Sequence, residues 1–428
     1  MSDFPKALQI EITNKCNFKC IYCIRKFWNI TPKDMEFQSY HKLSENFKRL
    51  DKLILYGLGE PLVHPDFLKM LCLARDQLKD NGEICFSTNG SLLNNKIADK
   101  IVKEIGVNRI SFSLDTIEHT KLENLRVGSK TSNIIKNLKY VSKIKKLSKV
   151  PLTLSLEMVI LKDNFQDLPN LIKFAGENNI DSILVTNIIT YSEIFEARYI
   201  YATINKKSYE ISKEILNEGE KLIHDAVVES HSLSYIQTPS INSIRKYHEL
   251  WVEVEKSGYW LNLPFLIKKM DEFAILNEVE NIFKESLTIA KEYGVKLELP
   301  NLFADKKTRF CPYIKDDITV IRADGKIVPC MSFMYAHSEY VNFHVKRIKE
   351  VIFGDIKEKS LEEIWNDKSY TQFRLLRKFI NENIPWCGDC VYSTLGCFYV
   401  NSNEIDCQRN NYSCSECLYS VGIAKCML

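Results

Sequence analysis

Three cysteines near the start of the chain have the spacing of an iron–sulfur cluster site. They lie in the segment CNFKCIYC, as Cys16, Cys20 and Cys23. A cubane four-iron, four-sulfur cluster usually takes four thiolates. Three protein ligands would leave one iron open to an exchangeable ligand, by the logic of a catalytic zinc site. The alternatives are a zinc site whose fourth ligand lies elsewhere and a chance grouping.

A second group of cysteines lies at the other end of the sequence. Nine of the 14 cysteines fall here, which is one more than two fully ligated cubane clusters need. Two Cys-x-x-Cys pairs, CGDC and CSEC, also approach the spacing of a zinc ribbon. Spacing alone therefore leaves iron–sulfur and zinc open. Cys72 and Cys85 stand alone in apolar segments, where we expect them to pack as small buried hydrophobes.

Composition excludes several classes of function. The chain has 428 residues, of which 45% are hydrophobic, and its net charge of +3 favours neither nucleic acid nor a membrane surface. The most basic stretch, KNLKYVSKIKKLSKV (136–150), has the apolar spacing of an amphipathic helix with a solvated face. The sequence begins without a signal-peptide pattern and contains no membrane-length apolar run. We therefore expect a cytoplasmic protein, in which clustered cysteines indicate metal rather than disulfides.

The first half of the chain must supply the elements that position these residues. Short apolar runs alternate with segments of helical periodicity, which predicts βαβ units and a parallel sheet. The sheet is either open and doubly wound or a partial six-unit (βα) barrel, and in both cases function resides at the C-terminal ends of the strands. The six runs are ALQIEIT (7–13), KLILYGLG (52–59), EICFSTN (83–89), RISFSLD (109–115), LTLSLEMVI (152–160) and SILVTNI (182–188).

Unusual residues follow five of these strands. CNFKCIYC follows the first, and the others end in GLGEP, STNG, SLD and VTN. Each of these is an ordinary turn signal by itself. Together at one edge of one sheet they predict a pocket.

The rest of the chain divides into two further segments. We expect a first domain over 1–195, a helical segment over 196–305 and a cysteine-rich domain over 306–428. YEISKEILNEGEKLIHDAVVE and LNEVENIFKESLTIAKEYG in the middle segment have helical spacing. Between them lie Trp251, Tyr259 and Trp260, which we expect to pack in a core. ITVIRADGKIVPC carries the Asp-Gly signal of a hairpin.

Residues 7–190 resemble the radical S-adenosylmethionine (radical SAM) superfamily. Its signature is Cys-x-x-x-Cys-x-aromatic-Cys after a first barrel strand, and Tyr22 stands at the aromatic position. GLGEP resembles the superfamily's Gly-Gly-Glu-Pro segment, although Tyr56 replaces a glycine found in many members. The resemblance implies that SAM is bound by Tyr22, Gly57, Gly59, Glu60, Pro61, Ser87, Asn89, Asp115, Thr186 and Asn187.

The resemblance also implies a chemistry. The open iron of the cluster would bind the amino and carboxylate groups of SAM, and an electron would break the bond from sulfur to the 5′ carbon. The resulting 5′-deoxyadenosyl radical would abstract hydrogen from a substrate. The cofactors carry this chemistry, while the protein positions them and excludes water. A ferredoxin or flavodoxin is the expected electron donor. The catalytic acid or base is not identified, since Tyr191, Glu193 and Arg198 are indistinguishable from ordinary loop polarity.

The C-terminal segment resembles a SPASM domain, which holds one or two auxiliary four-iron clusters in many peptide-modifying radical SAM enzymes. The order of a hairpin, FGDIKEKSLEEIWN (353–366) and a cysteine group supports this resemblance. The pattern departs from the usual module after Cys397. We expect an inner cluster on Cys311, Cys330 and Cys407. An outer cluster would use Cys387, Cys390, Cys397 and one of Cys414, Cys417 and Cys426.

This tail is similar to that of radical SAM maturases associated with tungsten-cofactor oxidoreductases of the aldehyde:ferredoxin type. We therefore expect a maturase acting on the cofactor or polypeptide of such an enzyme. One alternative is a maturase of a ribosomally made peptide or of a sulfatase, although only 15 residues precede Cys16 and leave little room for a leader-binding domain. Another is a non-catalytic iron–sulfur scaffold or electron carrier, which would have no need of GLGEP and STNG.

Overall fold

The computed structural model describes residues 2–213, 221–222, 225 and 242–426. Within these residues, six parallel strands lie side by side in chain order and form the centre of a ten-stranded sheet. Every residue of the first strand is buried, as expected for a sheet covered on both faces. The strands are β1 (Ala7–Ile10), β2 (Lys52–Leu55), β3 (Glu83–Thr88), β4 (Arg109–Ser113), β5 (Thr153–Ile160) and β6 (Ser182–Asn187).

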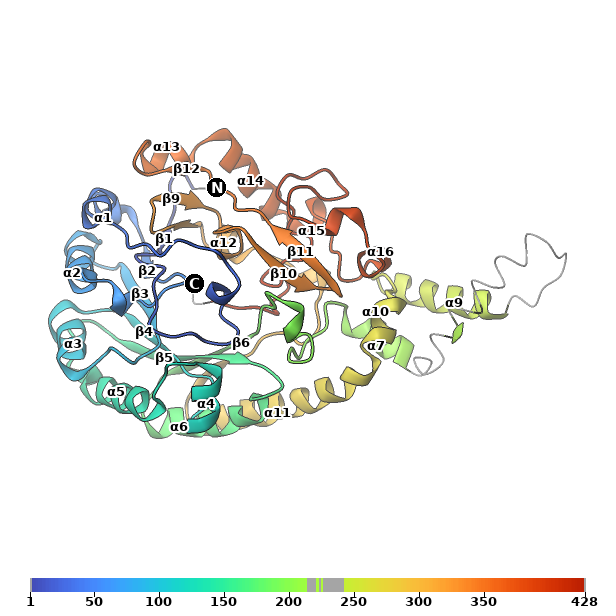
Figure 1. The fold of residues 1–428 in the computed structure, drawn as a ribbon, viewed down its shortest axis with the longest axis horizontal. Helices are drawn as coiled ribbons and strands as arrows, with labels where there is room; N and C mark the ends of the chain where they lie inside the picture. Colours follow the sequence, from blue (N-terminus) through green and yellow to red (C-terminus); the bar gives the residue numbers. More distant parts are fainter. Residues whose placement is uncertain (1, 214–220, 223–224, 226–241, 427–428) are drawn as a thin grey trace.

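Helices on the outside of the curved sheet connect successive strands (Figure 1). The alternation confirms the predicted βαβ units, and the curvature of the sheet makes it the partial barrel rather than the open doubly wound sheet. All six predicted strands are present. Leu138, Val141 and Ile144 are buried on the predicted amphipathic helix, whereas Leu147 beyond its end is exposed. The connecting helices are α1 (Phe37–Ser44), α2 (Phe67–Gln77), α3 (Asn95–Asp99), α4 (His119–Leu125), α5 (Thr131–Ile144) and α6 (Leu168–Glu177).

Later parts of the chain extend both edges of the sheet. β7 (Lys296–Glu298) pairs in parallel with β6, and β8 (Ile318–Ile321) pairs in parallel with β1. The predicted hairpin is formed by β8 and β9 (Lys326–Val328), and β12 (Gly354–Asp355) pairs with β9. The predicted boundaries near residues 195 and 305 therefore do not divide the sheet.

The middle segment is mainly helical. It contains α7 (Lys206–Ser212), α9 (Asn242–Lys256), α10 (Leu263–Lys268) and α11 (Phe273–Glu292). The second predicted helix lies in α11, which packs against α6, whereas most of the first predicted helix lies outside the described residues. Trp251 and Tyr259 pack against the core as expected, but Trp260 is 53% exposed.

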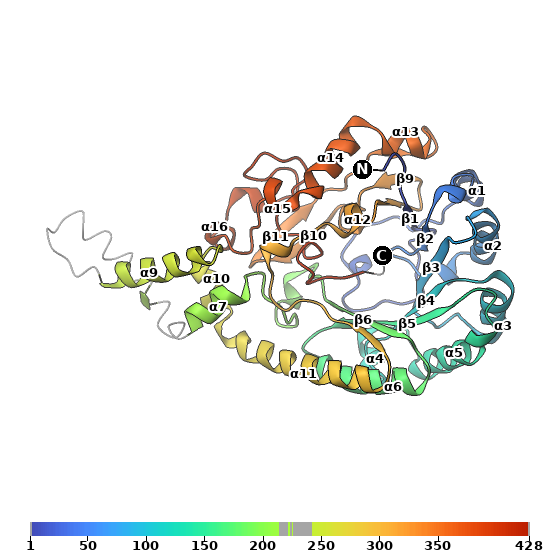
Figure 2. The ribbon, with the colours of Figure 1, turned by 180° about the vertical axis from the view of Figure 1, so that it is seen from behind.

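The C-terminal segment lies beside β1 and above the strand ends (Figures 1 and 2). The motif FGDIKEKSLEEIWN forms β12 and α13 (Leu361–Trp365), and a capping box between Ser360 and Glu363 closes the first turn of α13. After α16 (Val391–Thr394) the chain runs back toward the middle of the barrel (Figures 1 and 2). The other elements of this segment are α12 (Pro312–Lys315), β10 (His337–Val341), β11 (His344–Ile348), α14 (Lys368–Lys378) and α15 (Ile380–Asn383).

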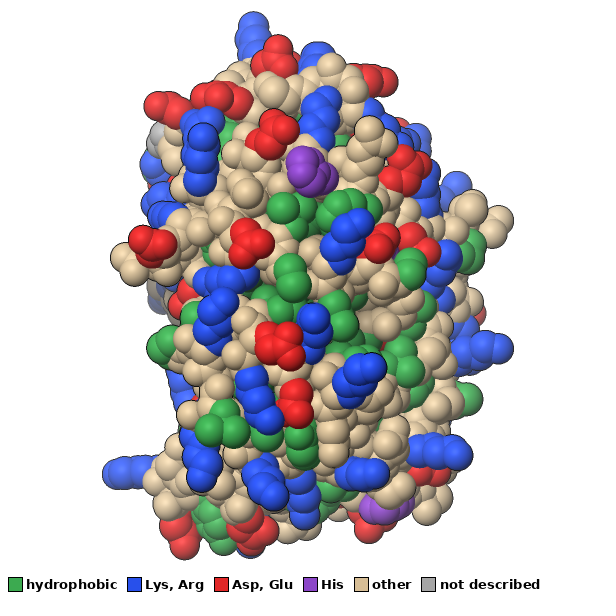
Figure 3. Space-filling view, turned by 90° about the vertical axis from the view of Figure 1, so that its left-hand side faces the viewer, with side chains coloured by type: hydrophobic (Ala, Val, Ile, Leu, Met, Phe, Trp, Pro, Cys, Tyr) green, Lys and Arg blue, Asp and Glu red, His purple; other side chains and the backbone are tan. Residues whose placement is uncertain are grey.

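The surface carries charges of both signs. On the face shown in Figure 3, which is covered by the first helices of the barrel, Lys and Arg side chains are interspersed with Asp and Glu. No helix among the described residues is both long and apolar enough to cross a membrane.

Candidate active site

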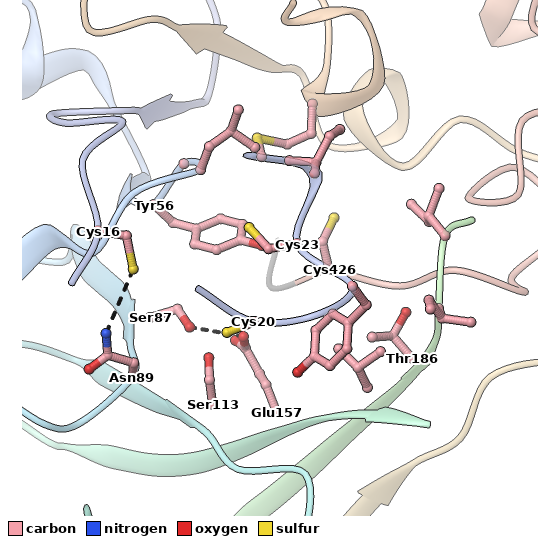
Figure 4. A pocket seen from close by; sticks show the side chains of 18 of the residues that line it. Cys16, Cys20, Cys23, Tyr56, Ser87, Asn89, Ser113, Glu157, Thr186 and Cys426 are labelled. Carbon is pink, nitrogen blue, oxygen red and sulfur yellow. Dashed lines mark hydrogen bonds between the residues drawn. The ribbon is translucent and has the colours of Figure 1, made fainter. Parts of the chain in front are cut away.

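A cavity of about 260 Å³ opens at the C-terminal ends of the barrel strands (Figure 4). Residues from five separate sequence motifs line it, as the sequence predicted. They are Cys16, Cys20, Tyr22, Cys23, Gly57, Gly59, Glu60, Ser87, Asn89, Ser113, Thr186 and Asn187.

The loop that carries the three cysteines is fixed by its backbone. Lys19 and Ile21 donate backbone hydrogen bonds to the carbonyls of Val127 and Leu125, at 2.8 and 2.9 Å. Burial raises the pKa of the Cys20 thiol to about 12. A thiolate here therefore needs a positive partner, which the irons of a cluster provide. The three thiols on one cavity fit a cluster with one iron left open.

The GLGEP segment packs against the cysteine loop so closely that only glycine fits. A Cβ on Gly59 would lie 2.2 Å from the carbonyl oxygen of Thr13 and 2.5 Å from that of Lys15. The next residue, Glu60, donates its backbone N–H to the same Lys15 carbonyl at 2.8 Å. The glycine thus brings the Glu60 carboxyl group into the cavity next to the cysteines.

Glu60 is the buried acid of this cavity. Its carboxylate accepts hydrogen bonds from Thr88 Oγ1 at 2.7 Å and from the Asn89 backbone N–H at 2.6 Å. Burial raises its pKa to about 7 in spite of these bonds. A carboxyl group in this position suits the amino group of a methionine moiety.

Asn89 connects the third strand to the cysteine loop. Its side-chain amide donates to Asn17 Oδ1 at 2.8 Å and lies 3.9 Å from Cys16 Sγ (Figure 4). A hydrogen bond to a cluster thiolate is one way in which a protein tunes the potential of an iron–sulfur group.

Two predicted SAM-binding residues do not line the cavity. Asp115 is fully buried behind it, because its carboxylate binds the Arg126 guanidinium at 2.7 and 2.8 Å and accepts the Tyr22 hydroxyl. In this structure it supports two side chains that line the cavity, Arg126 and Tyr22, and does not itself line it. Pro61 is buried at the first position of a short 3₁₀ helix (Pro61–Val63), where its fixed φ suits a helix start.

Sequence reasoning missed several residues of the cavity. Arg126 lines it beside Tyr22, and no local motif marks it. Glu157 had a signal, since it is the one acid in the apolar strand LTLSLEMVI. Its Oε2 accepts from Ser87 Oγ at 2.9 Å, whereas its buried Oε1 has no hydrogen-bond partner in the described part of the chain. The cavity wall thus holds a carboxyl group with one oxygen that the described residues leave unsatisfied.

The C-terminal tail forms one wall of the cavity. Asn187 at the end of β6 donates to the carbonyl of Ile423 at 3.1 Å, and the backbone N–H of Lys425 donates to Thr186 Oγ1 at 2.9 Å. Both predicted residues of the VTN motif therefore anchor the tail as well as line the cavity. Cys426 follows and lines the same cavity as Cys23.

Four other C-terminal cysteines line a second, smaller cavity. They are Cys311, Cys330, Cys414 and Cys417. Arg377, which is buried, donates from Nε to Cys414 Sγ at 3.3 Å. Ile189, Ser332 and Tyr419 line both this cavity and the first, so a single layer of side chains separates the two.

The remaining cysteines form a third group, consisting of Cys387, Cys390, Cys397 and Cys407. Burial is the main cause of the raised pKa of Cys407, and the nearby Cys390 and Cys397 thiols add to it. Burial likewise raises the pKa of Cys387 to about 12, with a contribution from Cys390.

This grouping differs from the predicted split of ligands. Cys407 was expected at the inner site, but it lies in a loop, residues 404–412, whose two ends are joined by backbone hydrogen bonds. Tyr412 donates its backbone N–H to the Glu404 carbonyl at 3.0 Å, and Ser413 donates to that of Asn403 at 2.7 Å. The loop 404–412 therefore leaves Cys407 exposed on the outer side and returns Cys414 to the inner cavity.

The cysteine groups are open rather than converging on a point. Across the described ranges, no three His, Cys, Asp or Glu side chains are arranged to hold a single metal ion. A cubane differs from a zinc site because each thiolate binds a different iron, so its ligands surround a volume.

Comparison with known families agrees with this architecture. Residues 10–175 match the radical SAM superfamily, and residues 311–391 match SPASM, described as an iron–sulfur cluster-binding domain. The fold is similar to that of Streptococcus suis SuiB bound to S-adenosylmethionine, with a TM-score of 0.54 and 16% identity over 93% of this chain and 74% of SuiB.

Two curated relatives show different extents of similarity. The tungsten-containing aldehyde ferredoxin oxidoreductase cofactor-modifying protein of Pyrococcus furiosus is 27% identical over 98% of this chain and 97% of its own length. A probable GTP 3′,8-cyclase of Methanocaldococcus jannaschii is 31% identical over 51% of this chain and 68% of its own. These matches and the cavity geometry support one conclusion. The chain belongs to the radical SAM superfamily and is an enzyme whose radical SAM domain is followed by a SPASM domain.

Proposed function

We propose that this enzyme cleaves SAM reductively and acts in the maturation of a tungsten-dependent oxidoreductase, on its cofactor or its polypeptide. The similarity to the Pyrococcus furiosus cofactor-modifying protein carries the proposal, because it spans both cysteine regions and nearly the whole of each chain. The cyclase similarity covers about half of this chain, so it supports the shared radical chemistry only.

The residues of the cavity suit the binding of SAM beside a cluster. Cys16, Cys20 and Cys23 would hold a four-iron cluster, which when bound supplies the electron for cleavage to a 5′-deoxyadenosyl radical. Glu60 would accept hydrogen bonds from the methionine amino group. The free Oε1 of Glu157 would accept one from a ribose hydroxyl, and the tail would exclude water.

The other cysteines support two auxiliary clusters. We assign the inner one to Cys311, Cys330, Cys414 and Cys417, because these four thiols line one cavity. We assign the outer one to Cys387, Cys390, Cys397 and Cys407. A ferredoxin or flavodoxin would supply electrons. This partition uses eight of the nine C-terminal cysteines and leaves Cys426.

The test uses the tungsten enzyme itself as substrate. A tungsten aldehyde oxidoreductase would be purified from cells that lack the gene for this chain, then incubated anaerobically with reconstituted enzyme, SAM and dithionite. We expect 5′-deoxyadenosine to rise above the level without substrate, together with a mass change in the cofactor or polypeptide. The Cys20→Ala variant is the control and should give neither.

Two results would contradict this substrate assignment. One is 5′-deoxyadenosine formation that does not respond to the oxidoreductase. The other is tight binding of a short leader peptide that stimulates SAM cleavage, which would favour the peptide-maturase alternative.

A further inference from the structure

Cys426 is the C-terminal cysteine that the two auxiliary sites do not use. It is half-buried, and it lines the cavity that Cys16, Cys20 and Cys23 also line (Figure 4). The cysteines assigned to the inner cluster line a different cavity, on the other side of Tyr419. The position of Cys426 is therefore that of a side chain facing SAM or a substrate.

The tail holds this sulfur in place. Asn187 binds the carbonyl of Ile423, and Thr186 accepts the backbone N–H of Lys425, so hydrogen bonds from the end of β6 fix the residues just before Cys426. On its other side, Cys426 Sγ lies 3.9 Å from the hydroxyl of Tyr313. That hydroxyl also donates to Gln9 Oε1 on β1 at 3.2 Å, and Tyr313 is buried.

The surroundings of the sulfur belong to a ligand site. Glu157 lines the same cavity, its Oε1 is buried, and this oxygen has no hydrogen-bond partner among the residues that the structure describes. The Cys426 thiol, by contrast, has a hydrogen-bond partner, the Tyr313 hydroxyl. A ligand that approaches the Glu157 side chain would therefore lie in the cavity that Cys426 lines.

A thiol in this position has a chemistry that fits the cavity. The S–H bond is weaker than an aliphatic C–H bond, so a carbon-centred radical takes hydrogen from a thiol readily. An ordinary thiol is protonated at neutral pH, so it carries the hydrogen atom that such a radical takes.

We propose that Cys426 donates a hydrogen atom to the carbon-centred radical formed in this cavity. This inference rests on the proposed SAM cleavage. In the step, the S–H bond breaks, a C–H bond forms on the radical carbon, and a sulfur radical remains. One electron from a low-potential iron–sulfur donor or dithionite, together with one proton, restores the thiol. The substrate would then regain a hydrogen after losing one, as in an inversion or a rearrangement.

The experiment needs no natural substrate, because the 5′-deoxyadenosyl radical can itself be the acceptor. The full-length reconstituted enzyme would cleave SAM in D₂O, where the thiol carries deuterium. Mass spectrometry of the 5′-deoxyadenosine should then find one deuterium from solvent at the 5′ carbon. Cys426→Ser should lower this deuterium content about tenfold, because a serine hydroxyl is a poor hydrogen-atom donor placed at the same distance. Cys72→Ala, which removes a half-buried thiol on α2, should leave it unchanged.

A second measurement is independent of turnover. In the cluster-loaded enzyme, iodoacetamide should alkylate Cys426 but not Cys414 or Cys417, and SAM should protect Cys426. Cys426→Ser should also keep the full iron content.

The outcomes separate this inference from the proposed function. Deuterium retained in Cys426→Ser, unlabelled nucleoside from the wild type, or alkylation of Cys426 only after iron removal would overturn the inference alone. A wild type that forms no 5′-deoxyadenosine at any cluster loading would overturn the proposed function, and the inference with it.

Discussion

At the scale of single residues, Glu60 has the least ordinary environment in the site. It is 3% exposed, and its raised pKa of about 7 means that the neutral acid and the carboxylate have similar populations at neutral pH in the free protein. A carboxyl group whose pKa rises on folding stabilises the fold most at low pH, and this contribution falls as pH rises from about 4 to 7. Burial of Glu60 therefore lowers the free energy of unfolding near neutral pH, where its carboxylate form would bind SAM.

The state of Glu60 predicts a pH dependence of SAM binding. An amino group donates hydrogen bonds to the carboxylate and not to the protonated oxygen. Affinity should therefore rise by up to about tenfold per pH unit below 7 and level off above it. Calorimetric titration of the cluster-loaded enzyme between about pH 5.5 and about pH 8 measures the affinity on both sides of this pKa. The Glu60→Gln variant should bind SAM weakly, and its affinity should no longer rise with pH. An unchanged pH dependence in this variant would show that another group causes the rise.

The Asp115–Arg126 pair predicts a loss of stability. Asp115 is fully buried and Arg126 is 7% exposed, so Asp115→Asn would leave an uncompensated buried cation. We expect a cost of about 3–5 kcal/mol, seen as a thermal unfolding midpoint several degrees lower. Asp163→Asn is the matched control, because its pair with Arg198 is exposed and 3.9 Å long, and it should cost less than about 1 kcal/mol. Equal effects of the two variants would contradict the buried-pair account.

At the scale of elements, the loop after β2 depends on one close approach. Gly59→Ala would place a Cβ against the carbonyls of Thr13 and Lys15, and backbone atoms cannot move away cheaply. The variant should lose SAM affinity by at least about tenfold, because Glu60 and the cysteine loop shift apart. Equilibrium binding measures this loss.

Gly294→Ala is the control for this effect. Gly294 has a φ of +68° after α11, with no atom within 4 Å of an added Cβ in the described structure. The Gly294→Ala variant should lower the free energy of unfolding by about 1–2 kcal/mol through backbone strain and leave SAM affinity unchanged. A similar loss of affinity in both variants would show that global destabilisation, not the close approach, is responsible.

The elements also show what the sequence alone could predict. The six central strands and their polar ends are local patterns, so their order and the site at one edge could be read from the sequence. β7, with three residues, joins the sheet only because β6 offers it a free edge. Likewise, the groups of C-terminal cysteines depend on the loop 404–412, whose path is set by tertiary contacts. Arg126 and Cys426 reach the cavity from positions that no spacing rule connects to Cys16.

At the scale of the whole molecule, the cysteine groups predict separable iron contents. If three cubane clusters load, Cys20→Ala should lose about four irons per chain and all SAM cleavage, and the auxiliary iron should remain. Cys414→Ala combined with Cys417→Ala should lose about four irons from the inner site. Cys72→Ala should keep all the iron. Iron analysis and electron paramagnetic resonance measure the iron content and the clusters that remain in each variant. Loss of all clusters in Cys20→Ala would show that the sites are not independent.

The path of the C-terminal tail has a consequence for biogenesis. Residues 413–426 leave the ribosome after every strand of the barrel, yet Asn187 and Thr186 need them as partners. A nascent chain can thus fold its barrel before the C-terminal tail has closed one side of the active-site cavity. The cavity is therefore sheltered from solvent only after Cys426 has been synthesised, so radical chemistry in a protected site has to wait for that step.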